Sequence, residues 1–147
     1  MKILVTLLVL VAGMMAPTQA GINARLSQYL HSNILAALVS FCVGTGALLI
    51  YSLALRVPWP AAQTLTKAPW WVWLGGFCGA FLVTVTIMAA PRLGATVMFA
   101  FFLTGQMLAS LILDHFGLFG YPVQPINLWR TVGVVLLVSG LLLIRRF

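Results

Sequence analysis

The sequence predicts an all-α integral membrane protein with five transmembrane helices per chain. Of its 147 residues, 63% are hydrophobic and only 6% are charged, and the mean hydropathy is +1.12. A soluble domain carries roughly a quarter charged residues, because its surface faces water. The apolar residues also gather into runs of membrane-spanning length. Composition and patterning therefore favour helices in lipid over a water-facing globule.

Charged and turn-forming residues divide the chain into five apolar segments. We expect membrane spans at residues 3–24, 34–55, 70–90, 93–113 and 127–144. The first four match the roughly 20 residues that cross the hydrocarbon core as a helix. Because the connections are short, residues 1–147 are expected to form a single five-helix transmembrane domain. The turn between the third and fourth spans is expected at Pro91, since proline interrupts helices.

The first span carries two amides, Gln19 and Asn23, which lie four residues apart and so share one helical face. Pro17 precedes them and is expected to kink the helix. Two interpretations stand: the amides line a substrate path, or they join neighbouring helices by hydrogen bonds. Lys2 and the apolar run after it also fit a signal peptide. The run continues without charge to Ala24, which favours a retained spanning helix.

The second span is an apolar run between the polar stretch at residues 27–33 and Arg56. It contains Cys42, and the third span contains Cys78. Two cysteines without a CxxC spacing make neither a disulfide framework nor a metal site. We therefore expect both to be small apolar core residues, and we expect no metal.

The third span opens with three tryptophans, Trp70, Trp71 and Trp73. Indole rings prefer the level of the lipid headgroups, so an aromatic belt is one interpretation. A stacking wall for a substrate, with Trp73 as its candidate residue, is the other. Gly75 and Gly79 lie four residues apart, a spacing typical of closely packed membrane helices. They are expected at a helix contact rather than at a ligand.

The fourth span carries a polar stripe of Gln106, Ser110 and Asp114, again spaced by four residues. Gln106 and Ser110 are candidates for a substrate path. Asp114 is the only acidic residue of the chain, so it is the sole Asp/Glu candidate for coupling transport to a proton or cation. The alternative is a structural role at the membrane edge, where Asp114 caps the helix or pairs with Arg130.

The fifth span is the least regular. Arg130 and Arg145 are separated by only about 21 Å of helix at 1.5 Å per residue. Arg130 must therefore lie within the helix and either snorkel to the interface or face protein. Gly133 and Gly140 lie seven residues apart on one face, which suits a seam between paired helices.

The net charge of +7 does not point to nucleic acid, because the basic residues stand singly at the ends of apolar runs. On one side of the membrane the spans place Lys2, Arg56, Lys67 and Arg130, and on the other Arg25, Arg92, Arg145 and Arg146. This balance gives no preferred orientation. It reflects either a weak signal or a chain that inserts both ways and pairs head to tail. An antiparallel pair would be an inverted repeat, as in many transporters.

No set of residues points to catalysis. The sequence has no Ser/His/Asp set, no carboxylate pair, no phosphate loop and no cofactor motif, so we expect neither an enzyme nor a cofactor.

An ordered set of short motifs nevertheless resembles a known family. The motifs are Gly13 to Leu26 with Gln19 and Asn23, Trp71 to Gly79, Ala90 to Ala95, Gly105-Gln106 and Asp114 to Leu118. Together they resemble the YdcZ family of bacterial inner-membrane exporters, in the drug/metabolite transporter superfamily, over essentially the whole chain. The resemblance implies five helices and chains that pair in opposite orientations.

The seven-residue glycine spacing of the fifth span also looks like the dimerising last helix of small multidrug resistance transporters. Those transporters use a membrane-embedded glutamate in the first helix, whereas the first span here contains no acidic residue. The proton or cation exchange mechanism of those transporters therefore cannot be assigned to this chain.

Residues and resemblance together predict an exporter in the bacterial inner membrane. An antiparallel ten-helix homodimer, or a pair with an oppositely oriented sister chain, would move an unidentified small molecule by alternating access. The alternatives are a non-transporting subunit that assembles or stabilises a larger membrane complex, and a channel.

Overall fold

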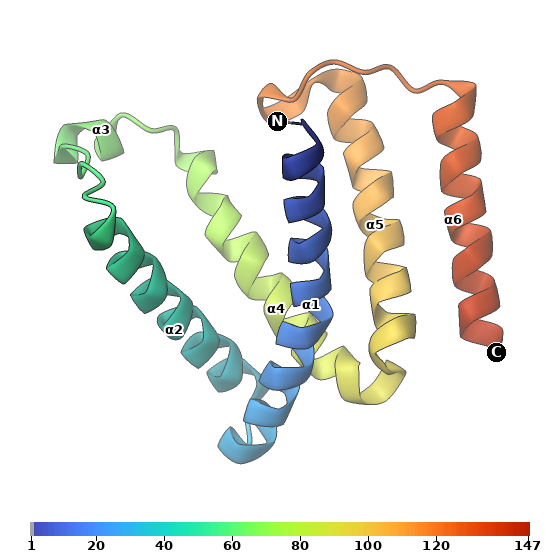
Figure 1. The fold of residues 1–147 in the computed structure, drawn as a ribbon, viewed down its shortest axis with the longest axis horizontal. Helices are drawn as coiled ribbons and strands as arrows, with labels where there is room; N and C mark the ends of the chain where they lie inside the picture. The colour runs from blue at the N-terminus through green and yellow to red at the C-terminus, as the bar shows by residue number, and fades with distance from the viewer. Residues whose placement is uncertain (1) are drawn as a thin grey trace. The chain divides into compact units, whose positions relative to one another are not determined.

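The computed structural model describes residues 2–147, apart from the side chains of residues 62 and 63, and every regular element within them is helical. Figure 1 shows the elements along the chain. They are α1 (Lys2–Leu30), α2 (Asn33–Ala54), α3 (Ala62–Thr66), η1 (Trp70–Trp73), α4 (Leu74–Leu93), α5 (Ala95–Phe116), η2 (Leu118–Gly120) and α6 (Leu128–Arg146). The expected all-α class is confirmed.

Five helical segments are long and apolar enough to cross a membrane: α1, α2, η1 with α4, α5 and α6. At about 1.5 Å per residue, α2 and α5 are each about 33 Å long, close to the ~30 Å hydrocarbon core. The helix α1 extends beyond the expected span at residues 3–24 and ends at Leu30. Its last turns are polar, and there Arg25 donates to the Gln28 side chain at 2.7 Å.

The turn between the third and fourth spans differs from expectation. We expected it at Pro91, but α4 continues through Pro91 to Leu93 and the chain turns at Gly94. Gly94 has φ +74°, which glycine adopts without steric cost. Pro91 lies in the last turn of α4, so its missing N–H removes only one hydrogen bond near the helix end. Pro17 likewise lies inside a continuous α1.

The chain forms two compact units, one ending at Arg92 and the other beginning at Leu93. We call them the N-terminal unit and the C-terminal unit. In the N-terminal unit, α1 and α2 are joined by a tight turn at His31 and Ser32. His31 has φ +52°, and the Ser32 N–H donates to the Ser27 carbonyl at 3.2 Å, as at many helix C-termini. The Ser32 hydroxyl then caps α2 by accepting from the Leu35 N–H.

The core of the N-terminal unit lies where α1, α2 and α4 meet. Ala36 and Ile87 are fully buried, and Ala37 and Val83 pack with them, while Leu26 contacts the same cluster from α1. Small side chains on α2 allow its neighbours to approach closely, which is how membrane helices gain packing energy. From this contact α1 and α2 separate toward their other ends (Figure 1).

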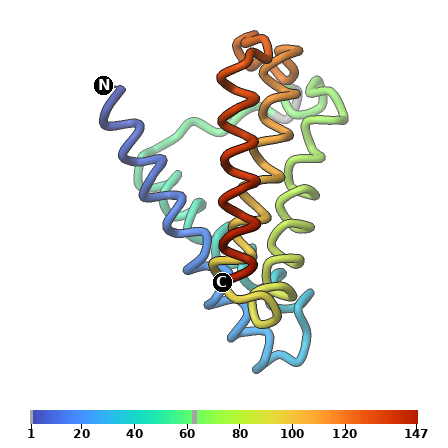
Figure 2. The backbone as a smooth tube through the Cα atoms, turned by 90° about the vertical axis from the view of Figure 1, so that its right-hand side faces the viewer, coloured from blue at the N-terminus to red at the C-terminus, as the bar shows by residue number. Residues whose placement is uncertain are grey.

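In the C-terminal unit, α5 and α6 form an antiparallel hairpin, seen side by side in both backbone views (Figures 1 and 2). The helix α5 ends at Gly117, which has φ +61°. Asn127 caps α6, and its side chain accepts from the Arg130 N–H at 3.0 Å. Arg130 therefore lies in the first turn of α6.

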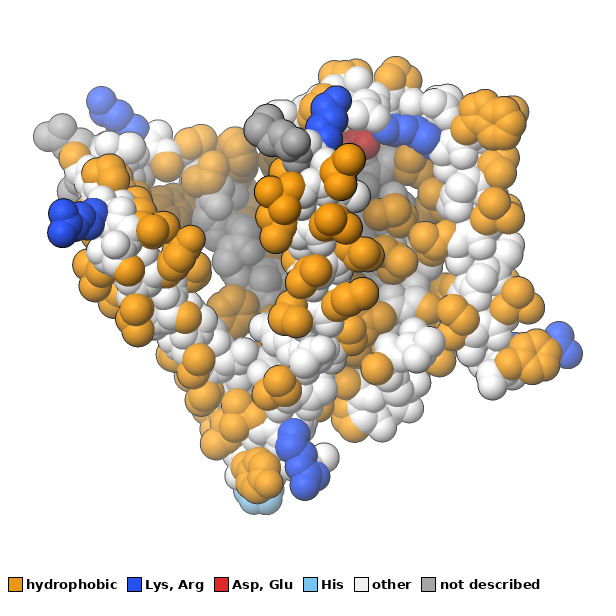
Figure 3. Space-filling model, viewed as in Figure 1, with side chains coloured by type: hydrophobic (Ala, Val, Ile, Leu, Met, Phe, Trp, Pro, Cys, Tyr) orange, Lys and Arg blue, Asp and Glu red, His pale blue; other side chains and the backbone are white. Residues whose placement is uncertain are grey.

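The helices keep most of their apolar side chains exposed, from Ile3 on α1 to Leu143 on α6. In Figure 3 orange hydrophobic side chains cover the visible sides of the helices, and blue Lys and Arg side chains lie near helix ends. Lipid is the solvent that suits such a surface, with the basic groups at the headgroups.

Candidate functional site

A groove lies between α1 and α2 in the N-terminal unit. Its cavity volume is ≈ 230 Å³. The lining residues are Gln19, Ser40, Phe41, Gly44, Thr45 and Leu48. We call it the α1–α2 groove. All but Gln19 come from one face of α2, because their spacing of three or four residues brings them into line on a helix.

The groove lies between the ends of both helices. Thr45 is about 18 Å along α2 from Asn33, and Gln19 is about 9 Å along α1 from Arg25, at 1.5 Å per residue. The groove therefore places an amide and two hydroxyls within the membrane-spanning lengths of α1 and α2, where little water is available to satisfy them.

Asn23 joins α1 to α2 beside the groove. Its side chain is only 4% exposed, and its Nδ2 donates to the Ser40 Oγ at 3.1 Å. This contact is the helix-joining hydrogen bond that the sequence left open as one role for the amides. Asn23 thus contacts a groove residue rather than lining the groove, whereas Gln19, on the same face of α1, lines it directly.

The lining contains no ionisable side chain. It also lies far from the ends of α1 and α2, where helix dipoles could favour a charge. The chemistry that the groove offers is therefore hydrogen bonding by neutral groups next to the ring of Phe41.

The stripe of α5 lies in the C-terminal unit. Gln106 is exposed and stands about 16 Å along α5 from Ala95, near mid-membrane. No hydrogen bond of its side chain is found among the side chains and backbone groups that the structure describes. Ser110 is half-buried one turn further on. An amide without a hydrogen-bond partner in the hydrocarbon core costs free energy. We therefore expect Gln106 to contact a polar group.

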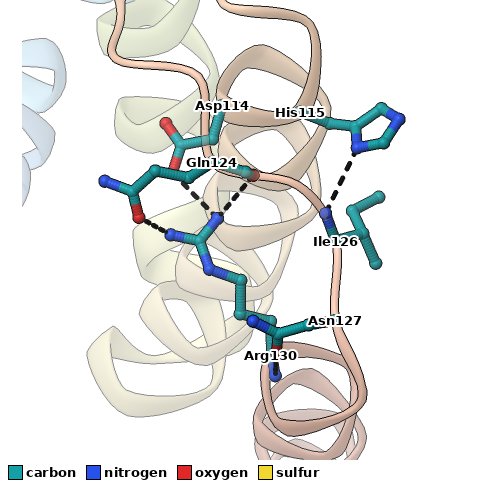
Figure 4. A network of polar contacts seen from close by, with 6 residues as sticks. All are labelled: Asp114, His115, Gln124, Ile126, Asn127 and Arg130. Atoms are coloured by element: carbon teal, nitrogen blue, oxygen red, sulfur yellow. Dashed lines mark hydrogen bonds and ion pairs between the residues drawn. The ribbon is translucent and has the colours of Figure 1, made fainter.

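Asp114 is held by Arg130 across the α5–α6 loop. Its Oδ2 accepts from the Arg130 Nη1 at 3.3 Å, with the two side chains 29% and 26% exposed. The same Nη1 donates to the Gln124 carbonyl at 3.1 Å, and Nη2 donates to the Gln124 Oε1. Figure 4 shows the Arg130 guanidinium between these groups. Arg130 thus faces protein, one of its two expected positions.

Backbone groups complete this network. The Gln124 N–H donates to the Asp114 carbonyl at 2.8 Å, and the Ile126 N–H donates to the His115 Nδ1 at 3.2 Å. Each contact ties the loop to the end of α5 (Figure 4). Asp114 therefore has the structural pairing that the sequence offered as the alternative to ion coupling.

The remaining candidates lie outside the groove lining. Trp73 is exposed in η1, at the entry to α4, as a headgroup belt requires. A Cβ at Gly79 would be 3.4 Å from the Phe41 ring, so Gly79 packs α4 against α2. Gly75, Gly133 and Gly140 have nothing within 4 Å of such a Cβ.

Within residues 2–147 no group of three or more metal-ligating side chains is found. Cys42 and Cys78 are free and exposed on the helix surfaces. The expectation that they are core residues is wrong, because in a membrane protein a small apolar side chain can face lipid as readily as it can be buried.

Sequence reasoning did not single out Ser40, Phe41 or Thr45. The signal was present, because Ser40 and Thr45 are polar residues within an otherwise apolar span. Ser40 and Thr45 lie five residues apart, which does not match the four-residue spacing of a polar helix face. The spacing therefore gives no reason to place them opposite Gln19, which lies on a different helix.

Comparisons with known proteins agree with this architecture. The family model described as "Putative inner membrane exporter, YdcZ" matches residues 4–143, nearly the whole chain. Comparison with curated proteins finds no match, and comparison with solved structures also finds none.

Proposed function

Because the chain belongs to the YdcZ family and is a multi-pass protein of the inner membrane, we propose that it exports a small molecule by alternating access. The observation that carries the proposal is the α1–α2 groove, which offers Gln19, Ser40 and Thr45 within the membrane-spanning lengths of α1 and α2. Transporters bind substrate between the two faces of the membrane, so that the site can open to either side in turn.

The working form that we propose is an antiparallel homodimer, with a pair of oppositely oriented sister chains as the variant. Three features support it. The basic residues are balanced between the two sides. Gly133 and Gly140 leave one face of α6 without a close neighbour, which suits a helix–helix seam. Gln106 carries an exposed amide at mid-depth, which a second chain or a substrate would satisfy.

We assign Asp114 to fastening the α5–α6 loop rather than to ion coupling. Its carboxylate already has Arg130 as a partner, near the membrane edge. A coupling carboxylate must exchange its partner in each cycle, and a partner that also binds Gln124 opposes that exchange.

Efflux from proteoliposomes tests the function. Vesicles containing the purified chain are loaded with a mixture of small neutral, cationic and anionic solutes, and the released compounds are measured by mass spectrometry. We expect saturable release of a subset of the neutral or anionic solutes. Gln19→Leu should reduce it strongly, because the variant removes a groove amide. Thr6→Val is the matched control, since Thr6 bonds only its own helix at the Lys2 carbonyl.

The alternative is a subunit that assembles or stabilises a membrane complex without transport. The open face of α6 favours it equally, because another protein could pack there. No release of any solute above protein-free vesicles, with a stoichiometric partner in native membranes, would favour this role. Release that does not saturate would instead indicate a channel.

A further inference from the structure

We propose that the α1–α2 groove selects a small, uncharged solute that both donates and accepts hydrogen bonds and carries an apolar part. This inference rests on the proposed export function and specifies its substrate class. It narrows the substrate from neutral or anionic to neutral alone.

The charge of the solute follows from the lining and the depth. The groove contains no ionisable side chain to pair with a cation or an anion. A charged group near the centre of the bilayer costs about 2.5–3.5 kcal/mol even on an insertion scale. The positive end of a helix dipole could offset that cost for an anion, but it acts only within the first turn of a helix. The groove lies near the middle of both α1 and α2.

The hydrogen bonding of the solute follows from three side chains. Ser40 accepts from the Asn23 Nδ2, so its own hydroxyl proton is available to donate to a bound acceptor. Gln19 offers both an amide donor and a carbonyl acceptor, and Thr45 offers a hydroxyl. In hydrocarbon these groups have no water to replace a missing partner, so a solute without polar groups would leave them unsatisfied.

The size and the apolar part follow from the walls. A volume of ≈ 230 Å³ is below the ~300–1,000 Å³ of sites for drug-sized ligands. Phe41 and Leu48 line the groove with the polar groups, and the Phe41 ring is backed by Gly79 on α4. A lipid acyl chain would match the walls but not the amide of Gln19.

Charge-selective cysteine labelling tests this inference without knowledge of the natural substrate. Cys42 and Cys78 are first replaced by alanine, and Thr45→Cys is introduced as the probe in the groove. The protein in nanodiscs is treated with hydroxyethyl, trimethylammonioethyl or sulfonatoethyl methanethiosulfonate, which are neutral, cationic and anionic. Labelling rates are measured by mass spectrometry.

Two control positions calibrate the rates. Gln28→Cys lies on the exposed polar end of α1 and gives the intrinsic rate of each reagent. Val43→Cys lies on the face of α2 opposite the groove and is 68% exposed. Its thiol faces lipid, where the reactive thiolate is disfavoured, so it should label slowly with all three reagents.

With each rate divided by that of the same reagent at Gln28→Cys, we expect the neutral reagent to label Thr45→Cys roughly 70-fold faster than either charged reagent. A cost of ~2.5 kcal/mol corresponds to about that factor. Gly79→Leu should cause loss of this labelling, because a side chain there pushes the Phe41 ring into the groove. Gly75→Leu, with open space around it, should not.

Equal labelling by charged and neutral reagents would overturn the inference. The inference would also be overturned if the neutral reagent labelled both Thr45→Cys and Ser40→Cys no faster than Val43→Cys. Lipid, a second copy or another part of the chain would then fill the groove. Charge selectivity without efflux would support the site and refute export. Efflux without charge selectivity would support export and refute the substrate class.

Discussion

Removal of the Arg130 guanidinium should release the α5–α6 loop. In the structure this group donates to the Asp114 carboxylate at 3.3 Å and to the Gln124 carbonyl at 3.1 Å, and it also contacts the Gln124 side chain. The perturbation is Arg130→Gln, which keeps a polar side chain but removes the charge and the fork of donors.

The magnitude follows from the partial burial of the pair. The two side chains are 26% and 29% exposed, so the cost lies between the ~0.2–1 kcal/mol of exposed pairs and the ~3–5 kcal/mol of breaking a fully buried pair. We expect about 2 kcal/mol for opening of the loop. At about 1.4 kcal/mol per factor of ten, this is a change of roughly 30-fold in the opening equilibrium.

Hydrogen exchange with mass spectrometry, in nanodiscs, measures that equilibrium. The informative amides are those of Gln124 and Ile126, which donate to the Asp114 carbonyl and to the His115 Nδ1. Arg130→Gln should speed their exchange roughly 30-fold. Arg145→Gln is the matched control, because Arg145 lies at the other end of α6 over the Phe101 ring.

A double-mutant cycle separates the ion pair from the other contacts. Asp114→Asn alone should cost about 1 kcal/mol, because Arg130 keeps its bond to Gln124. The double variant should then show a coupling of about 1 kcal/mol. Unchanged exchange in Arg130→Gln, or equal acceleration by Arg145→Gln, would refute the assignment of this network as the loop fastening.

Three further predictions concern packing and topology. Ser40→Ala should destabilise the N-terminal unit by about 1–2 kcal/mol, because the buried Asn23 amide loses its bond to the Ser40 hydroxyl and stays unsatisfied. Equal stability of Ser40→Ala and wild type in denaturant titration would contradict this prediction. Gly117→Ala should destabilise the protein by at least ~1 kcal/mol, since φ is +61° and the new Cβ would lie 2.6 Å from Val123. Gly13→Ala is the control and should not destabilise it, and similar melting temperatures for the two variants would contradict the need for glycine at the end of α5. Single cysteines at the two chain ends, labelled from one side of native membranes in a cysteine-free background, should each react about halfway if both orientations coexist; complete labelling at one end alone would exclude the antiparallel homodimer.

Local sequence patterns were sufficient for the spans, because their signal is one-dimensional. Helical length and hydropathy follow from the thickness of the bilayer, so five spans could be predicted from runs of apolar residues. The boundary at Gly94 was missed because a proline in the last turn of a helix removes only one hydrogen bond, whereas glycine alone turns the chain cheaply at φ +74°.

The sequence by itself determined the class, the number of spans, the family and the polar residues in the membrane, including Gln19, Asn23 and Asp114. Tertiary structure alone decided which helix each of them meets. Gln19 lines a groove, whereas Asn23 donates a hydrogen bond to Ser40. Asp114 forms an ion pair with Arg130 across the loop. The physical reason is that spacing along one helix fixes only which side chains share a face. The partner opposite that face depends on how two helices cross, and close packing of small residues such as Ala36 and Ala37 sets that crossing.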